Sequence, residues 1–167
     1  MSRTNATKDL LHPRNKHRTP YNFEKLIAVD PPLSAFTEEN KYGSVSINSK
    51  AVVALNRALL KLHYNIKNWS IPENFLCPPI PGRVDYVHYV ADLLADENEG
   101  TIPQGSNIKC FDVGTGASCI YPLLGNAEYG WSFVASDNNV EALNAAKNNL
   151  KQNPQAASAI QLEVQKE

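Results

Sequence analysis

The spacing of apolar residues predicts several helices in the first part of the chain. From Ser49 to Tyr64, apolar side chains recur at helical spacing, and Ser49 is available as an N-cap. A similar pattern runs from about Arg83 to Asp96. Its core stripe is formed by Val84, Val87, Val90, Leu93 and Leu94. A shorter helix is predicted from Tyr21 to Val29, because the run Asp30-Pro31-Pro32 ends it.

The second part of the chain alternates short apolar runs with helical patterns. The stretch after the first run resembles a helix that Pro122 cuts short. Asn138 or Asn139 can cap a helix from Val140 to about Lys151, with inward positions Leu143, Ala146 and Leu150. Strands are predicted at residues 108–113, 131–137 and 160–164. This order predicts an α/β fold with a parallel sheet and right-handed crossovers.

Three such strands make up about half of a doubly wound sheet, so we expect the sequence to end within the domain. Prolines crowd residues 71–82 and predict a stiff connector. We therefore divide the chain into a basic arm (1–20), a helical extension with its proline-rich connector (21–82), and the cofactor-binding half of an α/β domain (83–167).

Composition excludes several classes of protein. With 167 residues and 43% hydrophobic content, the chain can bury the core of one ordinary domain. Its apolar runs are shorter than the roughly 18 residues that cross a bilayer, and its N-terminus lacks the apolar stretch of a signal peptide. We expect a cytoplasmic protein without a membrane partner. Because Cys77, Cys110 and Cys119 lack Cys-x-x-Cys spacing, neither a disulfide framework nor a metal site is expected.

The net charge of -1 conceals a basic N-terminus, in which Asp9 is the one acid between Arg3 and Arg18. The basic side chains there are Arg3, Lys8, Arg14, Lys16 and Arg18, with His12 and His17 among them. Such an arm can neutralise the phosphates of a nucleic acid. The alternative is a solvated terminus that binds nothing.

The strongest functional signal is a glycine turn at the end of the first predicted strand, Asp112-Val113-Gly114-Thr115-Gly116. Two glycines allow a sharp backbone turn and leave no side chain to keep a ligand from the main chain. About 20 residues later Asp137 ends the next strand, where a carboxylate can accept hydrogen bonds from ribose hydroxyls. Gly114, Gly116 and Asp137 are therefore candidate ligands of a nucleoside cofactor.

Two details of the turn distinguish between cofactor classes. A dinucleotide motif has a third glycine three positions after Gly116, where this chain has Cys119. Asp112 would repel a pyrophosphate but attract the cationic part of S-adenosylmethionine. The pattern favours S-adenosylmethionine. Two alternatives are a nicotinamide-dependent oxidoreductase and an ordinary strand-to-helix turn in which Asp112 caps a helix.

Three segments, Phe111–Gly125, Leu11–Arg18 and Leu76–Arg83, resemble in sequence and order the large-subunit ribosomal RNA adenine-N6 methyltransferase family. Its eukaryotic relatives methylate adenines in a small nuclear RNA and in messenger RNA hairpins. The resemblance extends over nearly the whole chain. It implies a Rossmann-like class I methyltransferase fold, of which this chain would hold the N-terminal part. It also implies that the full-length enzyme methylates the N6 amino group of one adenine in 23S rRNA with S-adenosylmethionine.

The resemblance also implies roles for individual residues. The backbone of Gly114 would contact the methionine end of the cofactor, Asp137 the ribose, and Arg83 the methionine carboxylate. A planar guanidinium suits a carboxylate because it can donate two parallel hydrogen bonds, although Arg83 could instead pair with Asp85 or solvent. Contacts to the backbone of 23S rRNA or its precursor would come from Arg14, Lys16, His17 and Arg18.

One element of the family is missing from this sequence. An Asn-Pro-Pro-Phe motif there accepts hydrogen bonds from the adenine amino group and stacks on the flipped base. Asp30-Pro31-Pro32-Leu33 does not replace it, because Leu33 cannot stack, and Cys77-Pro78-Pro79-Ile80 lacks both the amide and the ring. We therefore expect no methyl transfer by this chain alone. A non-catalytic RNA-binding module with a cofactor-like fold is the alternative function.

Overall fold

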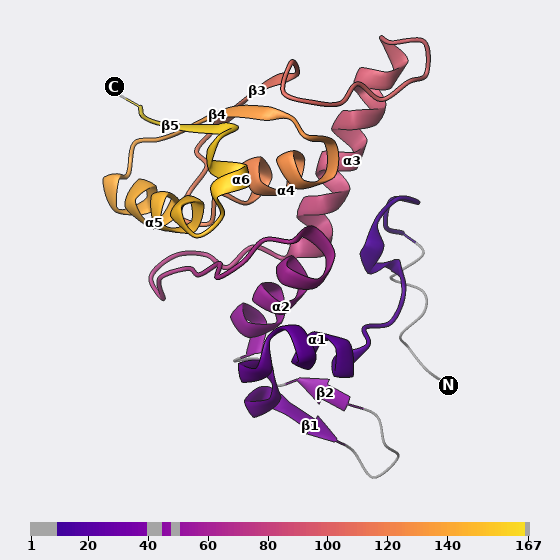
Figure 1. Cartoon of the computed structure of the whole chain (residues 1–167), viewed down its shortest axis with the longest axis vertical. Coiled ribbons are helices and arrows are strands. Elements are labelled where there is room, and N and C mark those ends of the chain that lie inside the picture. The colour runs from indigo at the N-terminus through magenta and orange to yellow at the C-terminus, as the bar shows by residue number, and fades with distance from the viewer. Residues whose placement is uncertain (1–9, 40–44, 48–50, 166–167) are drawn as a thin grey trace.

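Figure 1 shows the computed structural model, which describes residues 10–39, 45–47 and 51–165. The helices are α1 (Phe23–Val29), α2 (Val52–Tyr64), α3 (Ile80–Asp96), α4 (Ile120–Tyr129), α5 (Val140–Lys151) and α6 (Pro154–Ala157), with the 3-10 helices η1 (Lys16–Arg18) and η2 (Pro31–Phe36). The strands are β1 (Thr37–Glu39), β2 (Val45–Ile47), β3 (Lys109–Val113), β4 (Ser132–Asp137) and β5 (Ile160–Val164). The predicted arm residues Arg3 and Lys8 and the predicted cap Ser49 lie outside the described residues.

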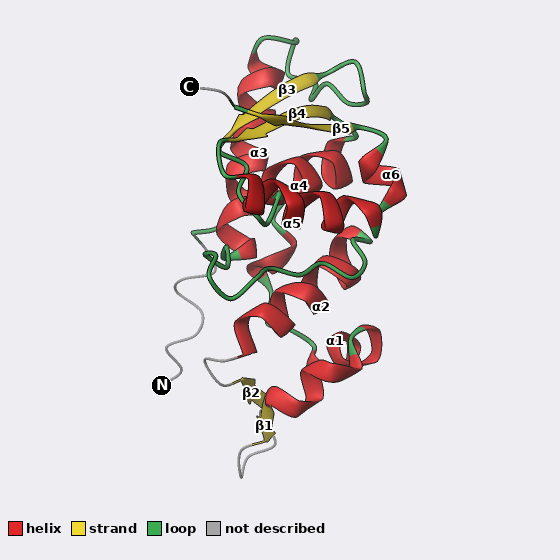
Figure 2. Cartoon of the chain, turned by 90° about the vertical axis from the view of Figure 1, so that its left-hand side faces the viewer, coloured by secondary structure: helices red, strands yellow, loops and turns green. Residues whose placement is uncertain are grey.

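Strands β3, β4 and β5 form a parallel sheet in that order, which confirms the predicted topology. Helices α4 and α5 connect the strands and lie on one face of the sheet (Figure 2). On the other face, Phe111 and Val113 of β3 are 67% and 60% exposed. Because β3 and β4 are adjacent and parallel, their carboxyl ends bring the glycine turn beside Asp137.

The sequence predicted that Pro122 would cut the next helix short, and this prediction is wrong. Helix α4 begins at Ile120 and continues to Tyr129, so Pro122 is its third residue. The first N–H groups of a helix have no acceptor within the helix, and a proline there loses no hydrogen bond. The proline therefore lies in the first turn of α4, immediately after the glycine turn.

Helix α3 begins at Ile80, three residues before the predicted start, with Pro81 in its first turn. The predicted core stripe is wrong at Leu93, which is 67% exposed. At about 100° per residue, Leu93 is about half a turn away from Val84, on the opposite side of the helix. The positions that face inward are Val84, Val87, His88, Ala91 and Ala95.

The N-terminal elements form a second, smaller core at the far end of the molecule from the sheet (Figure 1). Its buried residues are Leu26, Leu33, Ala54, Ala58 and Leu59. The chain leaves α1 at Asp30, as predicted, and η2 follows. Asp30 is buried and accepts hydrogen bonds from Arg57 and Lys61 of α2, so the Asp-Pro-Pro-Leu run has a structural role. The sequence did not predict the antiparallel pair β1–β2.

Candidate cofactor-binding site

The glycine turn has the geometry that its sequence predicts. Gly114 and Gly116 have φ angles of +77° and +65°, which L side chains rarely adopt. A Cβ atom at either position would have no neighbour within 4 Å, so both glycines face open space. The N–H groups of Gly114 and Thr115 donate to the carbonyl of Ser136 at 2.8 and 2.9 Å. The turn is thus anchored on β4 while its outer side stays open to a ligand.

Asp137 lies directly against this turn. Its Oδ2 accepts a hydrogen bond from the N–H of Gly116 at 2.9 Å, and its Oδ1 accepts one from the N–H of Asn139 at 2.9 Å. The side chain of Asn139 caps α5, as predicted. Each carboxylate oxygen has a further lone pair, so Asp137 can still accept hydrogen bonds from hydroxyl groups. Its position is therefore compatible with the predicted contact to a ribose.

Unpaired polar atoms are buried around the same turn. Asp112 Oδ2 and Ser136 Oγ are buried without a hydrogen-bond partner in the described part of the chain. Burial raises the pKa of Asp112; the Thr115 side chain acts against this shift, and the nearby charge of Asp137 adds to it. A cation at this place would stabilise the charged form of Asp112. Buried polar atoms are normally paired, so the unpaired oxygen of Asp112 beside the glycine turn indicates a polar ligand.

Trp69 and Asn149 support the glycine turn through hydrogen bonds to the backbone that follows it. The sequence did not predict either residue as part of the site. Trp69 is fully buried, and its indole N–H donates to the carbonyl of Ser118 at 2.9 Å. The amide of Asn149 on α5 donates to the carbonyls of Ala117 and Ser70. An asparagine on the inward face of an amphipathic helix was the one signal that could have identified this support.

Cys119 occupies the position where a dinucleotide motif has its third glycine. Its backbone is left-handed, with φ +50°, and it is fully buried at the N-cap of α4. Burial raises the pKa of its thiol to about 12, so the thiol remains protonated. The cysteine is therefore a packing residue of the turn rather than a nucleophile.

Arg83 lies in the first part of α3 and reaches the start of α4. Its Nη1 donates to the hydroxyl of Tyr121 at 2.7 Å. The predicted alternative, an ion pair with Asp85, is not formed; Asp85 instead accepts hydrogen bonds from the backbone of His12 and the side chain of Asn15. Tyr121 and Asp112 line one groove of about 470 Å³ between α3 and β3. Arg83 does not itself line this groove, but it contacts Tyr121, which does.

The predicted RNA-binding residues lie elsewhere, at the other end of α4. Arg14 donates to Asp92 at 2.6 Å, to the carbonyl of His88 and to the hydroxyl of Tyr129. Lys16 donates to Glu128 at 2.6 Å. Helix α4 has 10 residues and is therefore about 15 Å long, which separates these contacts from the glycine turn. The arm from residue 10 onward is docked on α3 and α4, so a solvated terminus is the wrong interpretation for this part.

His17 and Arg18 differ in exposure. His17 is 1% exposed, and its Nε2 lies 2.8 Å from the hydroxyl of Tyr64. Its burial gives no support to the predicted contact with RNA phosphates. Arg18 is half-buried and donates to the carbonyl of Leu11 at 3.2 Å.

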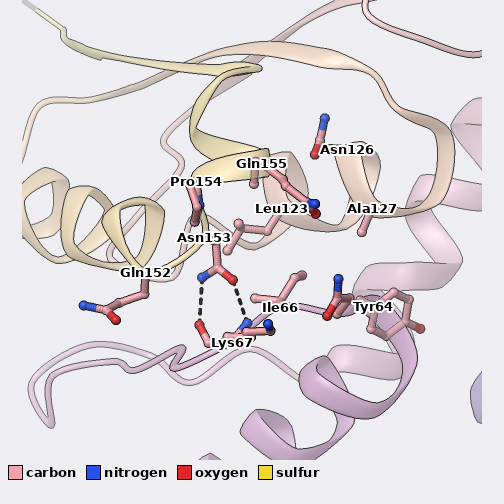
Figure 3. Close-up of a pocket in the computed structure, with 12 residues that line it drawn as sticks. Tyr64, Ile66, Lys67, Leu123, Asn126, Ala127, Gln152, Asn153, Pro154 and Gln155 are labelled. Atoms are coloured by element: carbon pink, nitrogen blue, oxygen red, sulfur yellow. Dashed lines mark hydrogen bonds between the residues drawn. The ribbon is translucent and has the colours of Figure 1, made fainter.

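A second pocket, of about 400 Å³, lies between the end of α2, the C-terminal half of α4 and α6 (Figure 3). Its floor contains Ile66 and Leu123, and amide side chains surround it. The amide of Asn153 binds both the N–H and the carbonyl of Lys67, at 2.6 and 2.8 Å. These two hydrogen bonds join the segment after α2 to the start of α6. The pocket contains none of the predicted site residues.

Two kinds of feature are absent from the described part of the chain. No helix in residues 10–39, 45–47 and 51–165 is long and apolar enough to cross a membrane. No group of three or more histidine, cysteine, aspartate or glutamate side chains in the same ranges could hold a metal ion.

Comparison with known proteins gives consistent relatives. A family model described as RNA methyltransferase matches residues 5–167. The chain is 51% identical over 166 residues to Ribosomal RNA large subunit methyltransferase F of Flavobacterium johnsoniae, covering 98% of this chain and 52% of that protein. A protein of the same name from Pseudomonas syringae pv. syringae is 56% identical over 149 residues, covering 87% and 45%. The chain spans about half the length of these curated relatives.

A solved structure extends the comparison to the fold. The N-terminal domain of human METTL16 in complex with SAH matches with a TM-score of 0.77 at 35% identity, covering 93% of this chain and 59% of that one. The agreement confirms the predicted Rossmann-like methyltransferase fold.

Proposed function

Because this chain belongs to the RNA methyltransferase family, we propose that it binds S-adenosylmethionine for the methylation of RNA. The observation that carries the proposal is the glycine turn, where two open glycines, Asp137 and the unpaired buried oxygen of Asp112 lie together. The complex of METTL16 with SAH supports the same choice of cofactor. A nicotinamide cofactor is disfavoured because Asp112 would oppose its pyrophosphate.

We assign each end of the cofactor to residues of this chain. The backbone of Gly114 contacts the methionine end, the open backbone at Gly116 receives the nucleoside, and Asp137 accepts hydrogen bonds from the ribose hydroxyls. Asp112 attracts the positive charges of the sulfonium and the amino group, and Arg83 binds the methionine carboxylate. The bound cofactor supplies an electrophilic methyl group. The residues of this chain hold that group in place relative to an incoming base.

We propose that the substrate of the whole protein is 23S rRNA or its precursor, methylated at the N6 amino group of one adenine in the cytoplasm. The names of the bacterial relatives support ribosomal RNA as the substrate class. A METTL16 structure in complex with a MAT2A 3′UTR hairpin, 34% identical over 93% of this chain, supports nucleic-acid binding by this fold. Arg14, Lys16 and Arg18 are the proposed contacts to RNA phosphates, since their side chains reach the surface.

Calorimetric titration with S-adenosylmethionine and with NAD tests the cofactor. We expect saturable binding of S-adenosylmethionine and no binding of NAD; the reverse result would refute the proposal.

Methyl transfer to 23S rRNA from a strain that lacks the modification tests the reaction. The 167-residue chain should not turn over, because its sequence contains no Asn-Pro-Pro-Phe. Robust transfer by this chain would refute the assignment of the adenine to that motif.

A further inference from the structure

We propose that Tyr121 is a positioning residue, which sets the guanidinium of Arg83 in place to bind the carboxylate of the cofactor. The inference rests on the proposed function, in which Arg83 binds the carboxylate, and it adds Tyr121 as a second residue that this function does not include. Tyr121 would not touch the cofactor. It would act through the orientation of Arg83.

Two contacts restrain Arg83 at once. Its Nη1 donates to the Tyr121 hydroxyl at 2.7 Å, and its guanidinium carbon lies 5.4 Å from the centroid of the same ring. A long arginine side chain loses rotamer freedom when it binds a ligand, which costs free energy. Because the hydrogen bond and the cation–π contact come from one rigid ring, they select an orientation before the ligand arrives.

The restraint leaves the charge of Arg83 available. Arg83 forms no ion pair with any residue in the described part of the chain, and Tyr121 provides a neutral acceptor. A carboxylate partner in place of Tyr121 would neutralise the guanidinium and compete with an anionic ligand. Of the five N–H donors of a guanidinium, one is used here, and a pair remains for a ligand carboxylate.

Tyr121 is itself held firmly. It is the second residue of α4, between the glycine turn and Pro122, so its backbone follows directly from the turn that receives the cofactor. Its ring lies 5.1 Å from the ring of Tyr86, which is one helical turn after Arg83 on α3. The tyrosine thus fixes the arginine of one helix relative to the glycine turn that precedes the other.

The same groove explains why this position matters. Tyr121 and Asp112 both line it, and Asp112 is the group that attracts the amino end of the cofactor. The methionine part carries an amino group and a carboxylate on one carbon, so its two binding groups must be set at a definite separation. Asp112 is fixed by the sheet, whereas Arg83 has a flexible side chain that needs the contact with Tyr121.

The test compares two ligands, S-adenosylhomocysteine and 5′-methylthioadenosine, which share the nucleoside but differ in the amino-acid end. Calorimetry on the purified protein should show that Tyr121→Phe weakens binding of S-adenosylhomocysteine about three- to tenfold, because the Arg83 side chain must then be ordered on binding. The affinity for methylthioadenosine should change less than twofold. Arg83→Gln should cause a larger loss for the first ligand only, and the double variant should lose no more than Arg83→Gln.

Tyr86→Phe is the matched control, because it removes a hydroxyl from the neighbouring ring that does not bind Arg83. It should leave both affinities unchanged. If Arg83→Gln discriminates between the ligands and Tyr121→Phe does not, the positioning role is refuted while the role of Arg83 stands. If Arg83→Gln has no effect, the proposed carboxylate contact itself fails. An equal loss for both ligands in Tyr121→Phe would mean a general defect of the fold and would also overturn the inference.

Discussion

Asp137 has two structural roles at the scale of a single residue. One oxygen binds the N–H of Gly116 in the glycine turn, and the other binds the N–H of Asn139, which caps α5. The side chain therefore joins the turn to the following helix before any ligand binds. Sequence spacing predicted its closeness to the turn, because the ends of adjacent parallel strands meet. Its backbone partners became known only from the structure.

Asp137→Ala should weaken binding of S-adenosylmethionine by about 1–3 kcal/mol, because charge-assisted hydrogen bonds to the ribose are lost. Calorimetry measures the change. Glu163→Ala is a suitable control, since this exposed carboxylate lies on β5 beside the end of β4. An unchanged affinity in Asp137→Ala would exclude the ribose contact.

At the scale of elements, the fold depends on close contact between α4 and β4. Gly125 lies on the face of α4 that touches the sheet, and an added Cβ would meet the ring of Phe133 at 2.5 Å. Gly82, in the first part of α3, would meet nothing within 4 Å. The packing therefore requires a glycine at position 125, whereas position 82 has room for a side chain.

Gly125→Ala should lower the free energy of unfolding by about 1–3 kcal/mol, because the overpacked helix must move away from Phe133. Gly82→Ala should raise it by about 0.5–1 kcal/mol through the better helix propensity of alanine. Urea unfolding of both variants gives the two values. If Gly125→Ala were as stable as the parent, the close approach of α4 to the sheet would be wrong.

A second contact between elements holds the arm on α3. Asp92 binds both His12 Nε2, at 2.8 Å, and Arg14, at 2.6 Å. The hydrogen bonds from His12 and Arg14 lower the pKa of Asp92. Arg14 also donates to the neutral hydroxyl of Tyr129, so the arm has an uncharged contact beside the charged one. Nothing in the local sequence of the arm predicted this partner, because the residues are about eighty positions apart.

Asp92→Asn should increase hydrogen exchange of the backbone amides in residues 10–18, since the charge that retains the arm is removed. Mass spectrometry of peptides from this segment measures the change. Asp96→Asn is the control on the same helix, at an exposed position. Equal exchange in the Asp92 and Asp96 variants would show that the arm docks through its neutral contacts.

At the scale of the whole molecule, buried titratable groups limit stability on both sides of neutral pH. Burial lowers the pKa of His88 and His63 below 6.5, so the folded state holds them neutral while the unfolded state binds protons. Burial raises the pKa of Cys119 and Tyr21 to about 12, so the folded state keeps protons that the unfolded state loses from about pH 9 to 10 upward.

The free energy of unfolding should therefore be largest between about pH 6.5 and 9. As pH falls below 6.5, the stability that the neutral histidines provide is lost, and above pH 9 the buried thiol and phenol reduce it. Each group contributes a slope of at most about 1.4 kcal/mol per pH unit. Urea unfolding at pH 5.5, 7.5 and 10 tests both limbs; equal stability at pH 5.5 and 7.5 would contradict the acid limb.

The sequence by itself determined the parallel strands, the helix α5 with its Asn139 cap, and the glycine turn with Asp137 at its side. These features depend on near neighbours in the chain, where hydrophobic period and turn chemistry act directly. Two predictions from the sequence were wrong: Leu93 does not face the core, and Pro122 does not end its helix. Both outcomes depend on where a helix begins and on which of its sides the neighbouring elements cover.

Only the tertiary structure decided how distant groups are paired. Arg83 binds Tyr121 rather than Asp85, and Trp69 supports the glycine turn. The basic side chains Arg14 and Lys16 pair with acids of α3 and α4. Many donors and acceptors are chemically equivalent in the sequence, and their choice among partners is made by packing across the folded chain. The sequence could therefore propose groups for the candidate cofactor site, whereas the fold determined which of them are already paired within the protein.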